Sequence, residues 1–229
     1  MIQKDPQKLR INQKKMHMTE FDNKAKEWDK DPKKIDRAEK FAFQIIQKKL
    51  KHSKIGAALE FGPGTGQVSL FLKDYIDQIY LVDKSEGMIN VLRENIKNRE
   101  IKNMHPILGD IVQDILQFDS VEMIYSLMSF HHVENLEELL HHFHQILLPG
   151  GVICVGDLEK EDGSFHHFSS DFKGHFGFDR PEIEKIMRLC GFKEIHYEVF
   201  FHLERETPTS KNQIKKQSFP LFFAVYEKI

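Results

Sequence analysis

The sequence predicts an α/β fold built on a Rossmann-like, doubly wound and mostly parallel sheet. A short apolar run ends at Phe61 and opens into a glycine-rich loop followed by a helix-periodic segment, which is a strand–loop–helix pattern. A second strand-like run, 78–82, leads into Asp83 and then into a helix that Ser85 is suited to cap. Further strand-like runs at 104–108, 121–126 and 152–155 alternate with helical periodicity. Such alternation is typical of parallel sheets with helical crossovers.

The predicted helices begin and end at suitable residues. Asp31 and Pro32 suit the first positions of a helix, and Asp179 is followed three residues later by the carboxylate of Glu182, as in a capping pattern. Gly191 ends this last helix. The clearest amphipathic helix is predicted over 134–147, where one face carries Leu136, Leu139, Leu140, Phe143 and Leu147.

The C-terminal region predicts two more strands. From Phe192 the chain alternates, with apolar residues on one side and polar residues on the other. The polar segment 204–217 is expected to be a loop. The segment 219–226 is almost wholly apolar, as expected of a strand covered on both faces. The predicted apolar side of the first strand consists of Ile195, Tyr197, Val199, Phe201 and Leu203.

The loop after Phe61 indicates a cofactor of the nucleotide type. Gly62, Gly64 and Gly66 stand at alternate positions, and glycine both tolerates positive φ and allows a backbone to approach a ligand closely. Their spacing, G-x-G-x-G, differs from the G-x-G-x-x-G of dinucleotide-binding loops. Glu60 would repel a pyrophosphate but suits a cationic or amino-bearing ligand. The alternative is an ordinary surface turn rich in glycine and proline.

Asp83 strengthens the cofactor interpretation. It ends the second predicted strand, and in a doubly wound sheet a carboxylate there can accept hydrogen bonds from both hydroxyls of a ribose. Alone, Asp83 could equally be a favourable charge at a helix N-terminus. Its placement together with the glycines favours a nucleoside ligand.

These segments resemble the class I S-adenosylmethionine-dependent methyltransferases. The resemblance rests on Glu60-Phe61-Gly62-Pro63-Gly64-Thr65-Gly66, on Asp83-Lys84-Ser85-Glu86-Gly87-Met88, and on later pieces in the same order. The later pieces are Gly109-Asp110-Ile111, Ser129-Phe130-His131-His132-Val133, Leu147-Leu148-Pro149-Gly150-Gly151 and the segment 157–166, the last being similar to a small-molecule subgroup of uncertain substrate.

The resemblance implies a seven-stranded sheet whose last strand inserts antiparallel between the fifth and sixth. It implies S-adenosylmethionine as cofactor, with Asp110 accepting from the adenine amino group and the Ile111 N–H meeting the ring. The cofactor-binding residues it implies are Glu60, Gly62, Pro63, Gly64, Gly66, Asp83, Lys84, Met88, Asp110, Ile111 and Ser126.

Residues 1–19 are rich in Lys and Gln without sustained periodicity, and we expect a flexible extension before a single domain over 20–229. Trp28 lies in a short helix predicted over 20–29, which in this family tends to fold over the cofactor. Trp28 therefore either packs on cofactor or substrate, or anchors the segment to the core.

Composition limits the partners. A chain of 229 residues with a net charge of −2 shows no general attraction to nucleic acid or to an anionic membrane, and it has no apolar run of membrane-spanning length. Cys154 and Cys190 have no metal or redox spacing, as expected of a cytoplasmic protein. We expect a small-molecule substrate and a monomer or homodimer.

Methyl transfer from a sulfonium needs alignment and exclusion of water more than it needs a catalytic triad. A base is useful if the acceptor is a hydroxyl or a protonated amine, and the candidates are His131, Asp157 and His166. Each has a simpler alternative, namely a pocket wall for His131, a cap for Asp157 and a solvated loop residue for His166. Histidines 131, 132, 141, 142 and 144 raise the possibility of a metal site, but no second-shell acid is evident and we expect no metal.

The segment 161–178 is long and rich in Phe, His, Ser and Gly. It is interpreted either as a substrate lid or as a segment whose Phe side chains pack permanently over the sheet.

The sequence thus favours a methyltransferase with a small-molecule acceptor. A cofactor-binding sensor or scaffold without catalysis is one alternative. A nicotinamide-dependent oxidoreductase is less favoured, because the glycine spacing and Glu60 do not suit a pyrophosphate.

Overall fold

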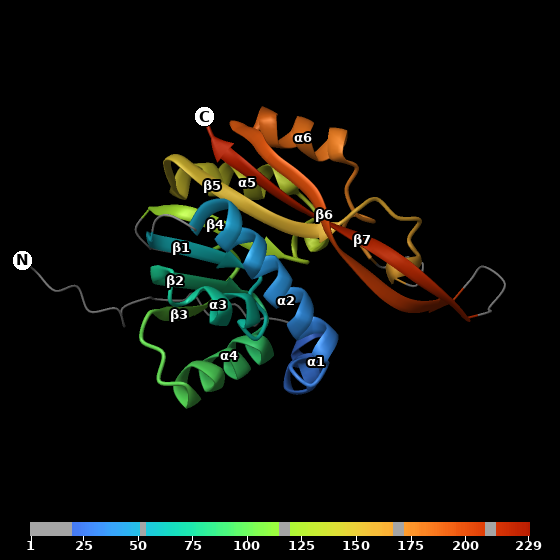
Figure 1. Ribbon diagram of the computed structural model, residues 1–229, viewed down its shortest axis with the longest axis horizontal. Helices are drawn as coiled ribbons and strands as arrows, with labels where there is room; N and C mark the ends of the chain where they lie inside the picture. The colour runs from blue at the N-terminus through green and yellow to red at the C-terminus, as the bar shows by residue number, and fades with distance from the viewer. Residues whose placement is uncertain (1–19, 51–53, 115–119, 167–171, 209–213) are drawn as a thin grey trace, which may run out of the picture.

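The computed structural model describes residues 20–50, 54–114, 120–166, 172–208 and 214–229. The predicted N-terminal extension, 1–19, lies outside them. The described chain forms a seven-stranded sheet in the order β3-β2-β1-β4-β5-β7-β6 (Figure 1). Its strands are β1 (Ile55–Phe61), β2 (Ile76–Asp83), β3 (Met104–Leu108), β4 (Val121–Leu127), β5 (Leu147–Leu158), β6 (Phe192–Pro208) and β7 (Ile214–Lys228).

The predicted fold class is confirmed. Neighbouring strands from β3 to β5 are parallel, whereas β7 runs antiparallel to both β5 and β6, between which it is inserted. The order reverses at β1, which pairs with β2 on one side and β4 on the other. Ligands of doubly wound sheets bind at such a reversal, outside the carboxyl ends of the strands.

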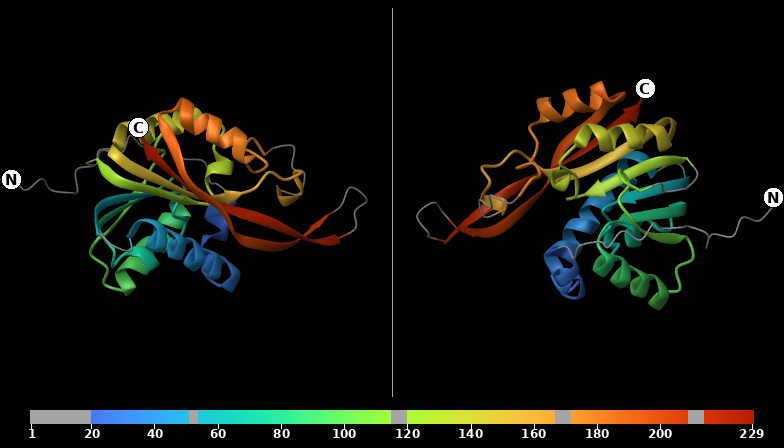
Figure 2. Two further views of the ribbon diagram at one scale, coloured as in Figure 1. Left: turned by 45° about the horizontal axis from the view of Figure 1, so that its top comes forward. Right: turned by 180° about the vertical axis from the view of Figure 1, so that it is seen from behind.

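Helices cover both faces of the sheet (Figures 1 and 2). One face packs against α2 (Pro32–Ile45), α3 (Gln67–Leu72) and α4 (Glu86–Asn98), and the other against α5 (Leu136–Ile146) and α6 (Arg180–Leu189). Before them α1 (Glu20–Trp28) lies against α4, and α2 continues as the π-helical turn η1 (Ile46–Leu50). Two short 3-10 helices, η2 (Phe130–His132) and η3 (Ser164–His166), follow β4 and β5.

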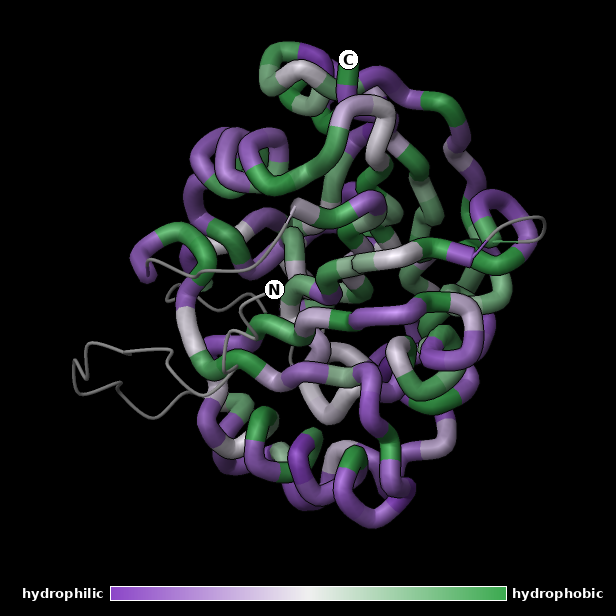
Figure 3. The backbone as a smooth tube through the Cα atoms, turned by 90° about the vertical axis from the view of Figure 1, so that its left-hand side faces the viewer, coloured by the Kyte–Doolittle hydropathy of each residue, from purple (hydrophilic) through white to green (hydrophobic). Residues whose placement is uncertain are grey.

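The hydrophobic pattern explains these layers. The central strands are buried on both faces. Along each helix, hydrophobic residues alternate with hydrophilic residues (Figure 3). In α5 the predicted apolar stripe is buried, and Leu147 is buried as the first residue of β5.

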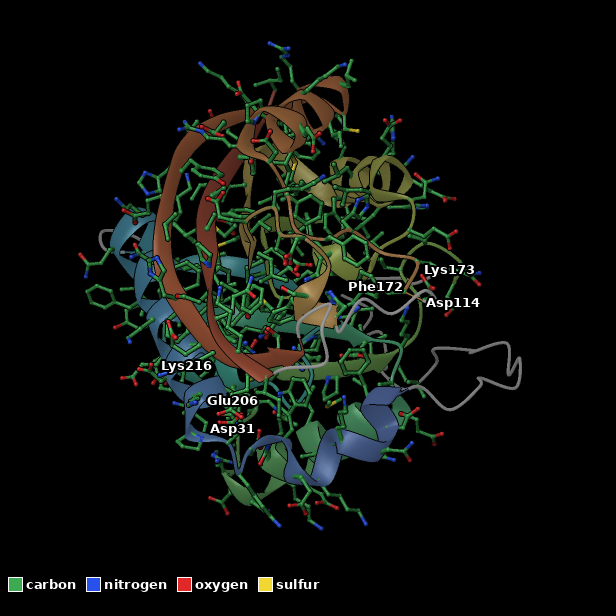
Figure 4. All side chains as sticks on the ribbon, turned by 90° about the vertical axis from the view of Figure 1, so that its right-hand side faces the viewer. Asp31, Asp114, Phe172, Lys173, Glu206 and Lys216 are labelled. Atoms are coloured by element: carbon green, nitrogen blue, oxygen red, sulfur yellow. The ribbon has the colours of Figure 1, made fainter. Side chains whose placement is uncertain are left out.

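Two predictions for the C-terminal strands are wrong. Within the expected loop 204–217, the described residues 204–208 and 214–217 are strand, because β6 and β7 pair there and reach beyond the rest of the sheet (Figures 1 and 2). There Glu206 stands opposite Lys216, both labelled in Figure 4. Register shifts at Glu194/His196 and Val199/Phe201 also break the alternation of β6. Consequently Ile195 and Val199 are 46% and 45% exposed, although the sequence pattern placed them on the apolar face.

Candidate functional site

The glycine loop leaves the carboxyl end of β1 with three left-handed residues, since φ is 65° at Gly62, 55° at Gly64 and 84° at Gly66. The three glycines differ in their surroundings. A Cβ atom at Gly62 would collide with the Ser129 side chain, and one at Gly66 with Leu92. At Gly64 it would meet only Met88 Sδ at 3.9 Å and Trp28 Nε1 at 4.0 Å. Packing therefore explains Gly62 and Gly66, whereas at Gly64 a Cβ atom would make only ordinary van der Waals contacts.

Asp83 connects this loop to the end of β2. One carboxylate oxygen accepts from the Gly64 N–H at 3.0 Å, and the other accepts from the Ser85 N–H at 2.8 Å. Burial raises the pKa of Asp83, and these two backbone bonds oppose that rise. A carboxylate has about four acceptor sites, so further hydrogen bonds to a diol remain available.

Glu60 lies deeper than the loop. It is 1% exposed and its carboxyl accepts from the Ser69 hydroxyl, which is 2.5 Å from the Tyr125 hydroxyl. Burial raises the pKa of Glu60 to about 8, so the side chain carries a proton at neutral pH. The structure thus places Glu60 in a buried polar network beneath the loop, and its direct contact with a ligand stays a prediction.

The other predicted cofactor residues surround this edge of the sheet. Ser126 is buried and donates to the Phe61 carbonyl at 2.9 Å, while Met88 is buried at the start of α4 and Lys84 is exposed. Asp110 accepts from the Val112 N–H at 3.0 Å, and Ile111 packs in the hydrophobic core. Pro63 stands between the first two glycines.

Helix α1 is tied down beside the loop by two carboxylates. Asp22 accepts from the Ser85 hydroxyl at 2.6 Å and the Gly87 N–H at 2.8 Å. Asp29 accepts from Thr65 at 2.5 Å and Asn95 at 3.1 Å. These bonds anchor α1 at both ends without using the indole of Trp28.

The indole of Trp28 has neighbours on two sides. Its Nε1 atom approaches Gly64, while the Lys34 ammonium stands 3.6 Å from the ring centroid in a cation–π contact. The indole therefore lies beside the glycine loop, and its packing on a ligand stays a prediction.

The structure brings His131 and Asp157 together. His131 Nδ1 lies 2.5 Å from Asp157 Oδ1, and the His131 backbone N–H donates to the other oxygen at 3.2 Å. Burial by itself would raise the pKa of Asp157, but the adjacent His131 and the hydrogen bonds to the carboxylate lower it overall. An ionised carboxylate only accepts, so Nδ1 carries the proton and Nε2 is the basic nitrogen of His131.

His166 also joins this group, together with His132, which the sequence analysis left without a role. One ring nitrogen of each of His131, His132 and His166 lies within 4.8 Å of the others. Burial and the neighbouring His131 lower the pKa of His132 to about 3, so it is neutral at physiological pH. Phe172, labelled in Figure 4, stacks on His166 with ring centroids 3.8 Å apart. The three predicted base candidates therefore share one site.

The segment 161–178 is described except for 167–171, and its two ends are packed. Phe165 contacts Phe219 with centroids 5.2 Å apart, and Phe178 is 4% exposed in the main hydrophobic core. Between them the His175 N–H donates to the His131 carbonyl at 2.7 Å. Permanent packing is thus right for Phe165 and Phe178.

Arg37 is a residue that the sequence analysis missed. Its Nε atom is buried and has no hydrogen-bond partner among the described residues. Burial lowers the pKa of Arg37 to about 10, while the charges of Asp157 and Asp31 oppose this. The only sequence signal is a cation one turn before Phe41, on the buried face of α2.

Arg205 of β6 approaches the same region. Its guanidinium donates to the Phe165 carbonyl at 2.9 Å and lies 4.7 Å from the centroid of that ring. Its charge also acts on Arg37. Arg37 thus lies within electrostatic reach of Asp157, and Arg205 lies beside Phe165.

Comparisons with known proteins agree with this geometry. Residues 59–155 match the family described as "Methyltransferase domain". An uncharacterised methyltransferase of Schizosaccharomyces pombe is 30% identical over 118 residues, covering 47% of this chain and 40% of that protein. One from Geobacillus sp. is 26% identical over 156 residues, covering 61% of this chain and 71% of that protein. The chain therefore spans under half the length of the yeast relative.

A solved structure supports the fold over a larger share of the chain. The structure of a SAM-dependent methyltransferase from Aquifex aeolicus aligns with a TM-score of 0.64 at 18% identity, covering 91% of this chain and 98% of that one. In the part of the chain that the structure describes, no helix is long and apolar enough to cross a membrane. Within the same part, Cys154 and Cys190 are both free thiols.

Proposed function

We propose that this chain is a class I S-adenosylmethionine-dependent methyltransferase and that it transfers the methyl group of that cofactor to a small-molecule acceptor. The observation that carries the proposal is the left-handed glycine loop after β1, in which the Gly64 N–H donates to the Asp83 carboxylate and the Gly64 position adjoins Met88 and Trp28 without steric conflict. Bound there, S-adenosylmethionine supplies a methyl group already activated by a sulfonium.

The residues of the chain fit such a ligand. Asp83 offers acceptor positions for a ribose diol, and the left-handed glycines leave room for a close approach of the backbone. Lys84 and Asp110 follow the ends of β2 and β3, on the side where an adenine would lie. Beside Gly64, the indole of Trp28 would help to exclude water from the bound cofactor.

The acceptor lies, in this proposal, at the group formed by His131, Asp157 and His166. Asp157 holds His131 in the tautomer whose Nε2 is basic, so this nitrogen can take a proton from an acceptor hydroxyl or ammonium. Phe165 and Phe172 give the site apolar walls. In-line alignment of acceptor and methyl group then supplies most of the rate enhancement.

We infer further that the acceptor is anionic. A buried cationic donor without a partner is costly, and the buried Nε atom of Arg37 has no hydrogen-bond partner among the described residues. Arg205 adds a second positive charge nearby. A carboxylate, phosphate or similar group on the acceptor would supply a partner for Arg37.

The test is a screen of acceptors that measures S-adenosylhomocysteine formation, with matched neutral and anionic analogues in each chemical class. Before the screen, thermal shifts with S-adenosylhomocysteine and with NAD establish which cofactor binds. Stabilisation by NAD alone contradicts the proposal. Stabilisation by S-adenosylhomocysteine without turnover of any acceptor supports the sensor or scaffold instead.

Arg37→Met tests the charge of the acceptor, with Arg188→Met on the exposed side of α6 as the control. We expect KM for anionic acceptors to rise about tenfold or more, since hydrogen bonds to charged groups contribute about 1.5–3 kcal/mol. Loss of S-adenosylhomocysteine binding in Arg37→Met would instead assign this residue to the cofactor.

A further inference from the structure

The three imidazoles of His131, His132 and His166 form a cluster that a general base does not require. They come from two separate segments, η2 after β4 and η3 after β5, and meet at the carboxyl edge of the sheet. We propose that these three histidines bind one divalent transition-metal ion of the zinc type, with a fourth position open to the methyl acceptor. Binding of the methyl acceptor at the fourth position rests on the proposed function, whereas binding of the ion by the three histidines does not.

The spacing of the rings suits such an ion. Nitrogen ligands about 2.1 Å from a tetrahedral ion stand about 3.4 Å apart, and their ring centroids about 5 Å apart. The observed centroids are 4.1 Å apart for His131 and His132, 5.2 Å for His131 and His166, and 5.7 Å for His132 and His166. One nitrogen of each ring already lies within 4.8 Å of the others, so modest side-chain rotations complete the site.

Carboxylates lie behind two of the rings. Asp157 Oδ1 lies 2.5 Å from Nδ1 of His131, within hydrogen-bond distance, whereas Glu161 Oε1 lies 4.0 Å from Nδ1 of His166, which is beyond it. Glu161 is itself held in place, because its other oxygen accepts from the N–H groups of Gly163 and Phe165, each at 2.9 Å. Histidines that ligate metals commonly donate their other nitrogen to such a carboxylate, which fixes the ring and increases its basicity.

The chemical nature of the ligand atoms indicates which metal ions would bind. Three imidazoles without a carboxylate ligand suit Zn²⁺, Co²⁺, Ni²⁺ or Cu²⁺, whereas Mg²⁺ and Ca²⁺ prefer oxygen. Three protein ligands with an open fourth position are typical of catalytic rather than structural zinc. The sequence analysis considered His131 and His132 together with the histidines of α5, whereas in the structure the third imidazole beside them is that of His166.

An ion here would serve the transfer directly. Bound to the acceptor's hydroxyl or thiol, it would lower the pKa of that group, and the released proton would pass to water; the ion would then replace His131, whose Nε2 ligates it, as the activating group. The carbon–sulfur bond of the sulfonium then breaks as the new bond to the acceptor atom forms, and sulfur retains the electron pair. The products are the methylated acceptor, S-adenosylhomocysteine and one proton.

The experiment measures metal binding without any acceptor. The full chain is stripped with a chelator, dialysed against Zn²⁺ or Co²⁺, and its metal content and the visible spectrum of the Co²⁺ form are recorded. The variants are His166→Ala and His132→Ala, and the matched control is His141→Ala, which removes an exposed histidine from α5. Stabilisation by S-adenosylhomocysteine is measured on every sample.

We expect one ion per chain in the wild type and in His141→Ala, with a tetrahedral Co²⁺ spectrum, and at least tenfold weaker binding in His166→Ala and His132→Ala. Stabilisation by S-adenosylhomocysteine should persist in all of them, which shows that the variants fold. No stoichiometric ion in the wild type, or equal binding in His166→Ala and His141→Ala, overturns the proposal. Metal binding without any response to S-adenosylhomocysteine contradicts the proposed function while supporting the metal site.

Discussion

Gly64 offers the sharpest test of the cofactor site. Replacing it by Ala adds a methyl group that the ligand-free protein can accommodate, since the nearest atoms are Met88 Sδ at 3.9 Å and Trp28 Nε1 at 4.0 Å. The φ of 55° makes an alanine here strained, which costs roughly 1–2 kcal/mol of stability. In the complex, the same methyl group would occupy space that the cofactor needs.

Gly150 provides a matched control. Its φ is 71° and a Cβ atom there would meet nothing within 4 Å, so Gly150→Ala imposes similar backbone strain. The residue lies near the amino end of β5, at the opposite edge of the sheet from the glycine loop. The two variants should therefore lose similar stability and differ only toward the ligand.

The assay is chemical denaturation with and without S-adenosylhomocysteine at a hundred times the wild-type dissociation constant. Wild type and Gly150→Ala should gain about 2.7 kcal/mol from the ligand. A tenfold loss of affinity in Gly64→Ala would reduce the gain to about 1.4 kcal/mol. If Gly64→Ala gains as much as Gly150→Ala, the space over Gly64 does not hold the cofactor.

Three further predictions follow from named contacts. Asp83→Ala should weaken S-adenosylhomocysteine binding by about 1–3 kcal/mol in calorimetry, through lost ligand bonds and a less constrained Gly64; wild-type affinity would mean that the ribose is held elsewhere. Glu60 keeps its proton up to about pH 8 when folded but only to about pH 4.5 when unfolded, so stability falls as pH rises between these values. Relative to Glu60→Gln, the wild type should lose up to about 1.4 kcal/mol per pH unit in that window, and a constant difference would refute the burial argument. Phe178→Ala should cost about 3–5 kcal/mol in denaturation, as for a core residue, whereas a loss below 1 kcal/mol would indicate a loosely packed segment.

The sequence was sufficient for the features that local chemistry dictates. Positive φ at Gly62, Gly64 and Gly66 follows from the intolerance of other residues for that conformation, and all three angles are left-handed. The caps at Asp31 and Ser85 and the stripe of α5 were likewise predictable, because they depend on neighbours within one or two turns.

The hairpin of β6 and β7 was not predictable in the same way. Its outer part pairs polar residues such as Glu206 and Lys216, so no apolar alternation marks it as strand. The bulges near Ile195 and Val199 add a residue to one strand, and the face of every following side chain changes. Both features arise from pairing with β7, which periodicity within β6 does not encode.

In the acceptor region, too, some features were predictable from the sequence and others were not. His131 and Asp157 were recognisable as residues at the ends of neighbouring strands, since the carboxyl ends of parallel strands share one edge. Only the tertiary structure decided three other features. Asp157 orients His131, and Arg37 reaches the same neighbourhood from α2. The imidazole cluster is completed by His166 and not by the histidines of α5. These groups are brought together by the packing of segments far apart in the chain, where short-range sequence patterns carry no information.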